Sequence, residues 1–324
     1  MSSEADWRPS ASLETLRHRA SLNQTIREFF AERNVLEIET PVLCRAATPD
    51  PVLASFVTEL QAAAGFTASP LYLQTSPEFF MKRLLAAGYG AMYQIGKAFR
   101  NEESGRRHNP EFTLLEWYRP GFSLQQLMDE VEQLMTVVLQ RAVTVERYTY
   151  RQLFQVLAGI DPVTATNDEW QHCLSSADVQ CSSQITLSAR DYADLVLTHI
   201  IEAAMPVACF VYNYPADQAA LARIRPDDPP VAERFELYIQ GVELANGFYE
   251  LTDAAEQRDR FVQENQQRQK AGLDEMPLDE KFLAALQHGM PDCSGVALGL
   301  DRLLMIALQK QSIDEVIAFP LCRI

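Results

Sequence analysis

Residues 99–119, FRNEESGRRHNPEFTLLEWYR, decide the fold that this sequence predicts. Tyr93, Ile95 and Phe99 alternate with the polar or small residues Gln94, Gly96 and Ala98, a period of two that is typical of strands. Residues 112–118 are interpreted as a second strand with the same period. We therefore expect two strands joined by a charged loop. The alternation places Phe112, Glu116 and Tyr118 on one face of the second strand and Trp117 on the other.

This hairpin gathers the groups that a nucleotide polyphosphate requires. Arg100 offers a guanidinium for bidentate contact with phosphate, Phe112 offers a flat aromatic face, and Glu116 offers a carboxylate. The alternative that these residues leave open is a surface hairpin with a solvated, charged loop.

The segments FRNE, RRHNPEF and LEWY within this stretch resemble motif 2 of the class II aminoacyl-tRNA synthetases, in the form that the lysyl-type enzymes have. Residues 29–41, FFAERNVLEIETP, resemble motif 1, and residues 295–305, GVALGLDRLLM, resemble motif 3. Three motifs in the family's order, spread over nearly the whole chain, are a strong signal that no single motif provides. The resemblance implies an α+β protein with the class II synthetase catalytic fold, an antiparallel β-sheet flanked by helices.

The expected domain organisation follows from these motifs. We expect residues 1–11 to form a disordered tail and residues 12–324 to form one synthetase-like catalytic domain with a small helical insertion at about 140–205. Ser12 is predicted to cap a helix from Leu13 to about Arg33, followed by a strand at residues 35–40. In the family this helix and strand build a two-fold interface, so the resemblance implies a homodimer; an ordinary amphipathic helix is the alternative.

Residues 75–78, TSPE, offer two roles for one acidic side chain. Ser76, Pro77 and Glu78 have the order of a helix start, where an acid interacts favourably with the helix dipole. In the lysyl-type enzymes the corresponding segment contacts the amino acid. We favour this role for Glu78 because the predicted helix leads directly to the motif 2 strand.

Residues 233–251, ERFELYIQGVELANGFYEL, hold three glutamates at intervals of seven: Glu236, Glu243 and Glu250. On a helix they would form one solvated acidic stripe, but Gly241 and the pair Asn246-Gly247 favour strands with turns. Three carboxylates facing one cleft would repel each other without cations. Magnesium, which prefers carboxylates together with substrate phosphates, is the cation that ATP brings.

The resemblance assigns roles to individual positions. The catalytic residues are Arg100 and Arg302, which also contact ATP. The other expected ATP contacts are Asn101, Glu102, His108, Asn109, Phe112, Glu243, Leu244 and Gly299. The expected amino-acid contacts are Ser76, Pro77, Glu78, Glu116, Tyr118, Glu250 and Ala297, with Glu116 and Glu250 around the side-chain amine. The expected magnesium ligands are Glu236 and Glu243.

Two departures from the lysyl-tRNA synthetases refine the expected activity. Only about a dozen residues precede the motif 1 helix, so we expect no anticodon-binding domain and no anticodon-type tRNA binding. Ala297 stands where the lysyl enzymes usually have a second glycine. Free-standing relatives with the GVALG form modify elongation factor P. The resemblance therefore implies ATP-dependent activation of (R)-β-lysine as an adenylate, with Mg²⁺, and its transfer to the ε-amine of a lysine on elongation factor P.

Two other classes of function remain open at this point. A free-standing lysyl-type enzyme that charges tRNA or forms a small amide would keep the same site, and a catalytically inactive regulatory paralogue would not need it. The net charge of −16 over 324 residues disfavours a large nucleic-acid footprint, because phosphate neutralisation needs basic surface. The six cysteines lack metal-type spacing, which predicts free thiols. With no apolar run of membrane-spanning length and no signal-peptide pattern, we expect a cytoplasmic protein without membrane contact.

Overall fold

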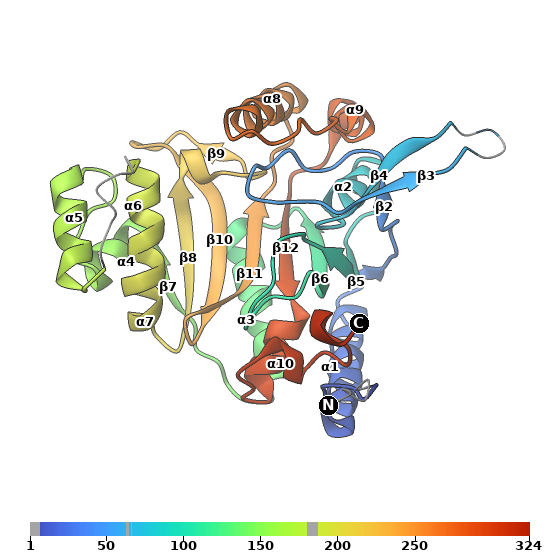
Figure 1. The fold of residues 1–324 in the computed structure, drawn as a ribbon, viewed down its shortest axis with the longest axis horizontal. Coiled ribbons are helices and arrows are strands. Elements are labelled where there is room, and N and C mark those ends of the chain that lie inside the picture. Colours follow the sequence, from blue (N-terminus) through green and yellow to red (C-terminus); the bar gives the residue numbers. More distant parts are fainter. Residues whose placement is uncertain (1–6, 63–64, 66, 180–186) are drawn as a thin grey trace, which may run out of the picture. The chain divides into compact units, whose positions relative to one another are not determined.

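The computed structural model describes residues 7–62, 65, 67–179 and 187–324, and Figure 1 shows its ribbon. The chain divides into two compact units. The terminal unit comprises Met1–Phe122, Val137–Leu139 and Leu251–Ile324. The central unit comprises Ser123–Thr136 and Gln140–Glu250.

Four strands of the terminal unit form the sheet that carries motifs 1, 2 and 3. They are β1 (Leu36–Glu37), β5 (Met92–Phe99), β6 (Glu111–Pro120) and β12 (Cys293–Gly299). β5 and β6 form the predicted hairpin, β12 pairs antiparallel with β6, and β1 pairs parallel with β5. The strand predicted at residues 35–40 is only two residues long, although the Ile38 N–H still bonds to the Tyr93 carbonyl at 2.9 Å.

Helix α1 (Leu13–Ala31) covers one face of this hairpin. The predicted cap is confirmed, because the Ser12 side chain accepts from the Thr15 N–H at 3.1 Å. Phe30 stacks on Tyr93 with ring centroids 4.4 Å apart and meets Trp117 edge-on at 5.4 Å. The odd-numbered face of β6 is therefore core, and alternation leaves Glu116 on the opposite face.

The start of the chain is anchored from residue 10 onward. Of residues 1–11, where the sequence predicts a tail, residues 1–6 lie outside the described part. The Ser10 N–H donates to the Ala318 carbonyl at 2.8 Å, and Ala11 is buried. These two residues pack onto the C-terminal segment.

Further elements complete the terminal unit. A small antiparallel sheet contains β2 (Leu43–Cys44), β3 (Val57–Leu60) and β4 (Ser69–Leu73), in the region where the sequence is rich in turns. The helices are α2 (Glu78–Ala86), α8 (Ala254–Lys270), α9 (Glu280–Gly289) and α10 (Leu300–Ala307), and short 3₁₀ turns cover Ile313–Glu315 and Leu321–Arg323. Figure 1 shows α8 and α9 next to each other. Phe79 of α2 stacks on Phe282 of α9 at 4.6 Å, which joins these helices.

The central unit has its own sheet and helices. Its strands are β7 (Glu146–Thr149), β8 (Ala208–Pro215), β9 (Ile224–Arg225), β10 (Val231–Ile239) and β11 (Val242–Tyr249). β10 pairs antiparallel with β8, β9 and β11, while β7 and β8 are parallel. The helices are α3 (Leu124–Val138), α4 (Tyr150–Leu157), α5 (Asn167–Ser176), α6 (Ala189–Val196) and α7 (Glu202–Ala204), with a π-helical turn at Leu197–Ile201. Helices α4 to α7 fall in the range expected for a helical insertion. An aromatic core of Tyr150, Phe154, Trp170 and Tyr214 packs α4 against α5 and β8.

The predicted α+β class with helices around largely antiparallel sheet is confirmed, and one parallel pair in each unit, β1–β5 and β7–β8, makes the sheet of that unit mixed. One turn prediction is wrong. Asn246 and Gly247 lie inside β11, where they pair with Glu236 and Phe235. The hairpin turn is at Gln240-Gly241, with positive φ of 53° and 66° at the two residues, the geometry that a tight antiparallel hairpin favours.

The cysteines in the described ranges have the free thiols that the sequence predicts. The five cysteines in the described ranges are free, and Cys181 lies outside those ranges. Among the described residues, no helix combines the length and apolar character that crossing a membrane requires.

Candidate active site

Glu116 is the centre of a buried polar cluster in the terminal unit. Its side chain is 2% exposed. It accepts from the Tyr118 hydroxyl at Oε1 and from the Ser76 hydroxyl at Oε2, both at 2.7 Å. Burial, reinforced by the nearby Glu78 carboxylate, raises the pKa of Glu116 to about 7 although both hydroxyls lower it. Such a carboxyl gains most from a cation that enters the site.

The residues that flank Glu116 across the sheet come from β5 and β12. Gln94 and Ala297 are its register partners, so all three side chains lie on one face. Gln94 is buried, and no described residue donates to its Oε1. Sequence reasoning missed Gln94, although its even-numbered position on the motif 2 strand was a usable signal.

The TSPE segment has both of the roles that its sequence offers. The Ser76 hydroxyl accepts from the Glu78 N–H at 3.1 Å at the start of α2, and it also donates to Glu116. Glu78 is bonded to Lys82 one turn later, with 2.6 Å between Nζ and Oε1. Lys82 was also missed, and its signal was the i, i+4 spacing from Glu78 on a predicted helix.

Arg100 lies at the end of β5 beside Phe112. Its guanidinium carbon is 5.2 Å from the Phe112 ring centroid, and its Nη1 is 3.7 Å from Glu103. The Nε atom is buried and meets no acceptor among the described residues. A buried donor of this kind fits a ligand that brings acceptor oxygens, as phosphate does.

Arg302 joins α10 to the motif 2 loop. Its Nη2 lies 2.5 Å from the His108 Nε2, and its Nε donates to the Arg107 carbonyl at 3.3 Å. Burial and the charge of Arg302 lower the pKa of His108, which keeps the imidazole neutral and lets its Nε2 accept. The fold thus brings together two predicted ATP contacts that are 194 positions apart.

Other predicted ATP contacts serve local structure in this arrangement. The Asn109 amide donates to the Glu111 carbonyl at 2.6 Å and accepts from the Leu321 N–H at 2.9 Å, so it ties the loop to the C-terminal segment. The Asn101 side chain accepts from the N–H of Glu102, which has a positive φ of 67° and is exposed. Gly299 ends β12 opposite Leu114.

Asp301 is a structural residue that sequence reasoning missed. Its carboxylate is buried and accepts from Arg19 of α1 at 2.5 Å and from the Thr113 N–H of β6 at 2.7 Å. It therefore fixes the helix of motif 3 to elements of motifs 1 and 2. Because Arg302 is the next residue of the same helix, its position is fixed together with that of Asp301.

In the central unit, Glu236 and Glu243 share a face of the β10–β11 hairpin because of a β-bulge. Glu236 pairs with Asn246 and Tyr238 pairs with Glu243, and the register shifts between them. Leu244 is the extra residue. On a regular strand, residues seven positions apart lie on opposite faces, as Glu243 and Glu250 would. The extra residue of the bulge brings both side chains to the same face.

The surroundings of Glu236 differ from those of a metal ligand with open lone pairs. Oε1 accepts from Arg234, and Oε2 accepts from Tyr214 and Tyr238, each at 2.6 Å. Burial and the two glutamates of this face, Glu236 and Glu243, raise the pKa of both tyrosines. Glu236 thus holds the arginine and the tyrosines in place.

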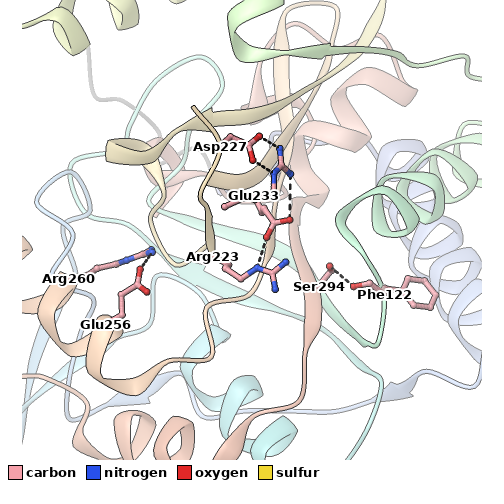
Figure 2. Close-up of polar contacts among 8 residues, drawn as sticks. Phe122, Arg223, Asp227, Glu233, Glu256, Arg260 and Ser294 are labelled. Atoms are coloured by element: carbon pink, nitrogen blue, oxygen red, sulfur yellow. Dashed lines mark hydrogen bonds and ion pairs between the residues drawn. The ribbon is translucent and has the colours of Figure 1, made fainter. Parts of the chain in front are cut away.

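An ion-pair chain supports the end of β11. Glu233 pairs with Arg223 at 2.5 Å and with Arg225 at 3.7 Å, and Arg225 also binds Asp227 (Figure 2). The Arg223 guanidinium lies 3.8 Å over the Tyr249 ring. The next residue, Glu250, is buried and forms a backbone bridge with Ala222.

Figure 2 also shows two contacts of the terminal unit. The Ser294 hydroxyl donates to the Phe122 carbonyl at 2.8 Å, which ties β12 to the loop after β6. Glu256 and Arg260 pair on the first turns of α8.

A pre-built protein cage for a metal ion is absent from the described ranges, where no group of three or more His, Cys, Asp or Glu side chains could hold one. Magnesium that arrives with a nucleotide needs only one or two carboxylates, because phosphates and water complete its shell.

Comparison with known proteins places the chain in a family. The model for class II tRNA synthetases (D, K and N) matches residues 3–323. This chain belongs to that family.

Its curated relatives within that family match over the full length. A protein of Proteus mirabilis named "Elongation factor P--(R)-beta-lysine ligase" is 48% identical over 325 residues, which is 100% of both chains. Proteins with the same name from Vibrio cholerae and Edwardsiella ictaluri are each 49% identical, the first over 98% of this chain and 99% of the relative and the second over 100% of both. The resemblance to the class II synthetases, and to their free-standing members, is confirmed.

Proposed function

We propose that this protein is a ligase that activates (R)-β-lysine with ATP and transfers it to the ε-amine of a lysine on elongation factor P. The full-length identity of about half to relatives that carry this name supports the proposal most strongly. The buried carboxyl cluster around Glu116 and the buried donor of Arg100 supply the chemistry that it needs.

The first step joins the amino acid to AMP. A carboxylate oxygen of β-lysine attacks the α-phosphorus of ATP, an O–P bond forms, the bond to the β-phosphate oxygen breaks, and diphosphate leaves. Arg100 donates to the α-phosphate, with Phe112 against the adenine, and Arg302 is held by His108 near the same loop. No protein nucleophile is required, so catalysis consists of positioning and charge stabilisation.

The amino acid's side chain is recognised by charge. The ε-ammonium binds Glu116, whose two hydroxyl donors, Ser76 and Tyr118, fix the orientation of the carboxylate. Glu250 is the second carboxylate assigned to this ammonium. A neutral side chain of the same length would leave Glu116 buried and uncompensated, and it would therefore be rejected.

Magnesium enters this proposal with ATP. Glu236 and Glu243 are the residues assigned to it, and Glu236 also holds Arg234, Tyr214 and Tyr238. When bound, the ion offsets negative charge on the phosphates.

In the second step the lysine ε-amine of elongation factor P attacks the carbonyl carbon of the adenylate. An amide C–N bond forms, the bond from carbon to the phosphate oxygen breaks, AMP leaves, and the amine releases a proton. The mixed anhydride is already activated, so the acceptor needs only to be held and deprotonated.

A homodimer in the cytoplasm is part of the same proposal. The motif 1 helix, the strand after it and the segment beyond expose apolar side chains at Leu13, Leu36, Val42 and Leu43. Exposed apolar side chains on elements that form the dimer interface in the family suit this proposal. Light scattering in solution, with Leu36→Glu as the variant, tests the dimer.

Mass spectrometry of elongation factor P tests the activity itself. Incubation with this protein, ATP, Mg²⁺ and (R)-β-lysine should add one β-lysyl group to a single lysine of elongation factor P. α-Lysine should react less. If elongation factor P stayed unmodified while tRNA became aminoacylated, the tRNA alternative would be favoured instead. No ATP–pyrophosphate exchange with any lysine isomer would favour the inactive paralogue.

A further inference from the structure

Lys82 carries a positive charge in the interior of the terminal unit. Its side chain is 0% exposed, and its ammonium is bonded to Glu78 at 2.6 Å. The ammonium also lies 5.9 Å from the centroid of the Phe282 ring. Lysine is almost never fully buried unless it is paired, because desolvation of the ammonium is expensive. A buried lysine in this position therefore needs a reason.

Lys82 belongs to a short chain of polar contacts that ends at Glu116. Lys82 bonds to Glu78, the Glu78 N–H bonds to the Ser76 hydroxyl, and that hydroxyl donates to Glu116. The ionised cluster holds two carboxylates and one ammonium. Its net charge is that of one carboxylate.

We propose that Lys82 is a positioning residue that holds the Glu78 carboxylate as a built-in ion pair, so that Glu116 is the one carboxylate of this cluster that is left to bind the substrate's ammonium. This assignment rests on the proposed function of the site. It adds a residue that sets how many positive charges the pocket accepts.

The charges that shift the pKa of Glu116 agree with this role of Lys82. The Glu78 carboxylate raises the pKa of Glu116 and the Lys82 ammonium lowers it, after burial, which is the largest cause. Two hydroxyls that bond to Glu116, those of Tyr118 and Ser76, also lower its pKa, and the uncharged Gln94 amide lies on the same face of the sheet. Without Lys82 two carboxylates would repel each other in a buried site, and Glu116 would hold its proton to higher pH.

The pH dependence of kcat/KM for β-lysine in ATP–pyrophosphate exchange tests the proposal. Because Glu116 must be ionised to bind an ammonium, the acidic limb of this profile reports its pKa in the free enzyme. Lys82→Met should move the limb upward by about one pH unit, which is roughly a tenfold loss on the acidic side of the profile. Lys82→Arg keeps the charge and should leave the limb near its wild-type position.

Glu78→Gln is a variant that should shift the acidic limb in the opposite direction. It removes the carboxylate that raises the pKa of Glu116 and leaves the Lys82 charge, so the limb should move downward even if the maximal rate falls. A merely structural role for Lys82 would lower the rate of Lys82→Met at every pH and leave its acidic limb in place. An unshifted limb in Lys82→Met would overturn the proposal.

A double variant covers the case in which Lys82→Met does not fold. Glu78→Gln with Lys82→Met contains no buried charge at either position, so it should fold, and its limb should lie above that of Glu78→Gln alone. Equal limbs in these two proteins would also overturn the proposal. Absence of β-lysine activation in the wild-type protein at every pH would instead refute the proposed function.

Discussion

At the scale of single residues, opposing contributions decide the chemistry. Glu116 accepts two hydrogen bonds that favour its ionised form, yet burial outweighs them and holds its pKa at about 7. His108 is driven in the other direction, because burial and Arg302 lower its pKa and keep it neutral. Each group is poised for one partner: an ammonium for Glu116 and an N–H donor for His108.

Arg100→Ala should abolish adenylate formation and leave the fold intact. The guanidinium packs on Phe112 and has a buried Nε without an acceptor among the described residues, so the fold loses little when it is removed. Loss of a donor to the reacting phosphate costs roughly 3 kcal/mol in the transition state, about a hundredfold in rate. ATP–pyrophosphate exchange measures this effect, with circular dichroism as the control. Near-normal exchange would contradict the assigned role.

Ala297→Gly should raise the activation of α-lysine relative to β-lysine. Ala297 lies opposite Glu116 in the register of β12 and β6, so its methyl group is near the amino acid's proposed position. One methyl group in a packed site changes discrimination by about 1–3 kcal/mol. Adenylate formation with each isomer at matched concentrations measures the ratio. If the ratio stays the same, the selectivity lies at other positions, with Ser76 and Glu78 as the next candidates.

At the scale of elements, a buried acid on helix α8 makes the stability of the fold depend on pH. Burial, and then the charge of Asp50, raise the pKa of Glu264 to about 7. Its Oε2 is buried and meets no donor in the described part of the chain. A carboxyl with a raised pKa stabilises the fold below its unfolded pKa of about 4.5, and this contribution is lost as the pH rises through about 7.

Glu264→Gln should therefore flatten the pH dependence of stability. At pH 8.5 the variant should be more stable than the wild type by about 1–3 kcal/mol, and near pH 4 it should have no advantage. Thermal melts across this pH range measure the difference. Asp259→Asn, at an exposed acid on the same helix, is the matched control and should change little. Parallel curves for Glu264→Gln and wild type would contradict the prediction.

At the scale of the whole molecule, net charge selects partners. The chain carries 44 acidic and 28 basic residues and a net charge of −16. A net negative charge of this size attracts positively charged surfaces and repels phosphate backbones at low ionic strength.

Binding of tRNA should accordingly be weak and non-specific, while elongation factor P should bind with an on-rate that falls as salt increases if its docking face is basic. Stopped-flow association at two salt concentrations measures the second effect, and filter binding measures the first. Selective, stable charging of one tRNA in vitro would refute this prediction.

The features that depend on local spacing were readable in the sequence alone. The period of two in residues 93–99 and 112–118 predicted the β5–β6 hairpin, Ser12 predicted the start of α1, and three motifs in order predicted the family. These signals are readable because side-chain periodicity and capping involve residues only a few positions apart.

Only the tertiary structure decided which partners those residues have. Asp301 binds Arg19 across 282 positions, and Asn109, an expected nucleotide contact, binds Leu321 across 212. The bulge at Leu244 placed Glu236 and Glu243 on one face, and complete burial made Lys82 a counter-ion. Burial and long-range pairing depend on how distant segments pack, and packing has no local pattern in the chain.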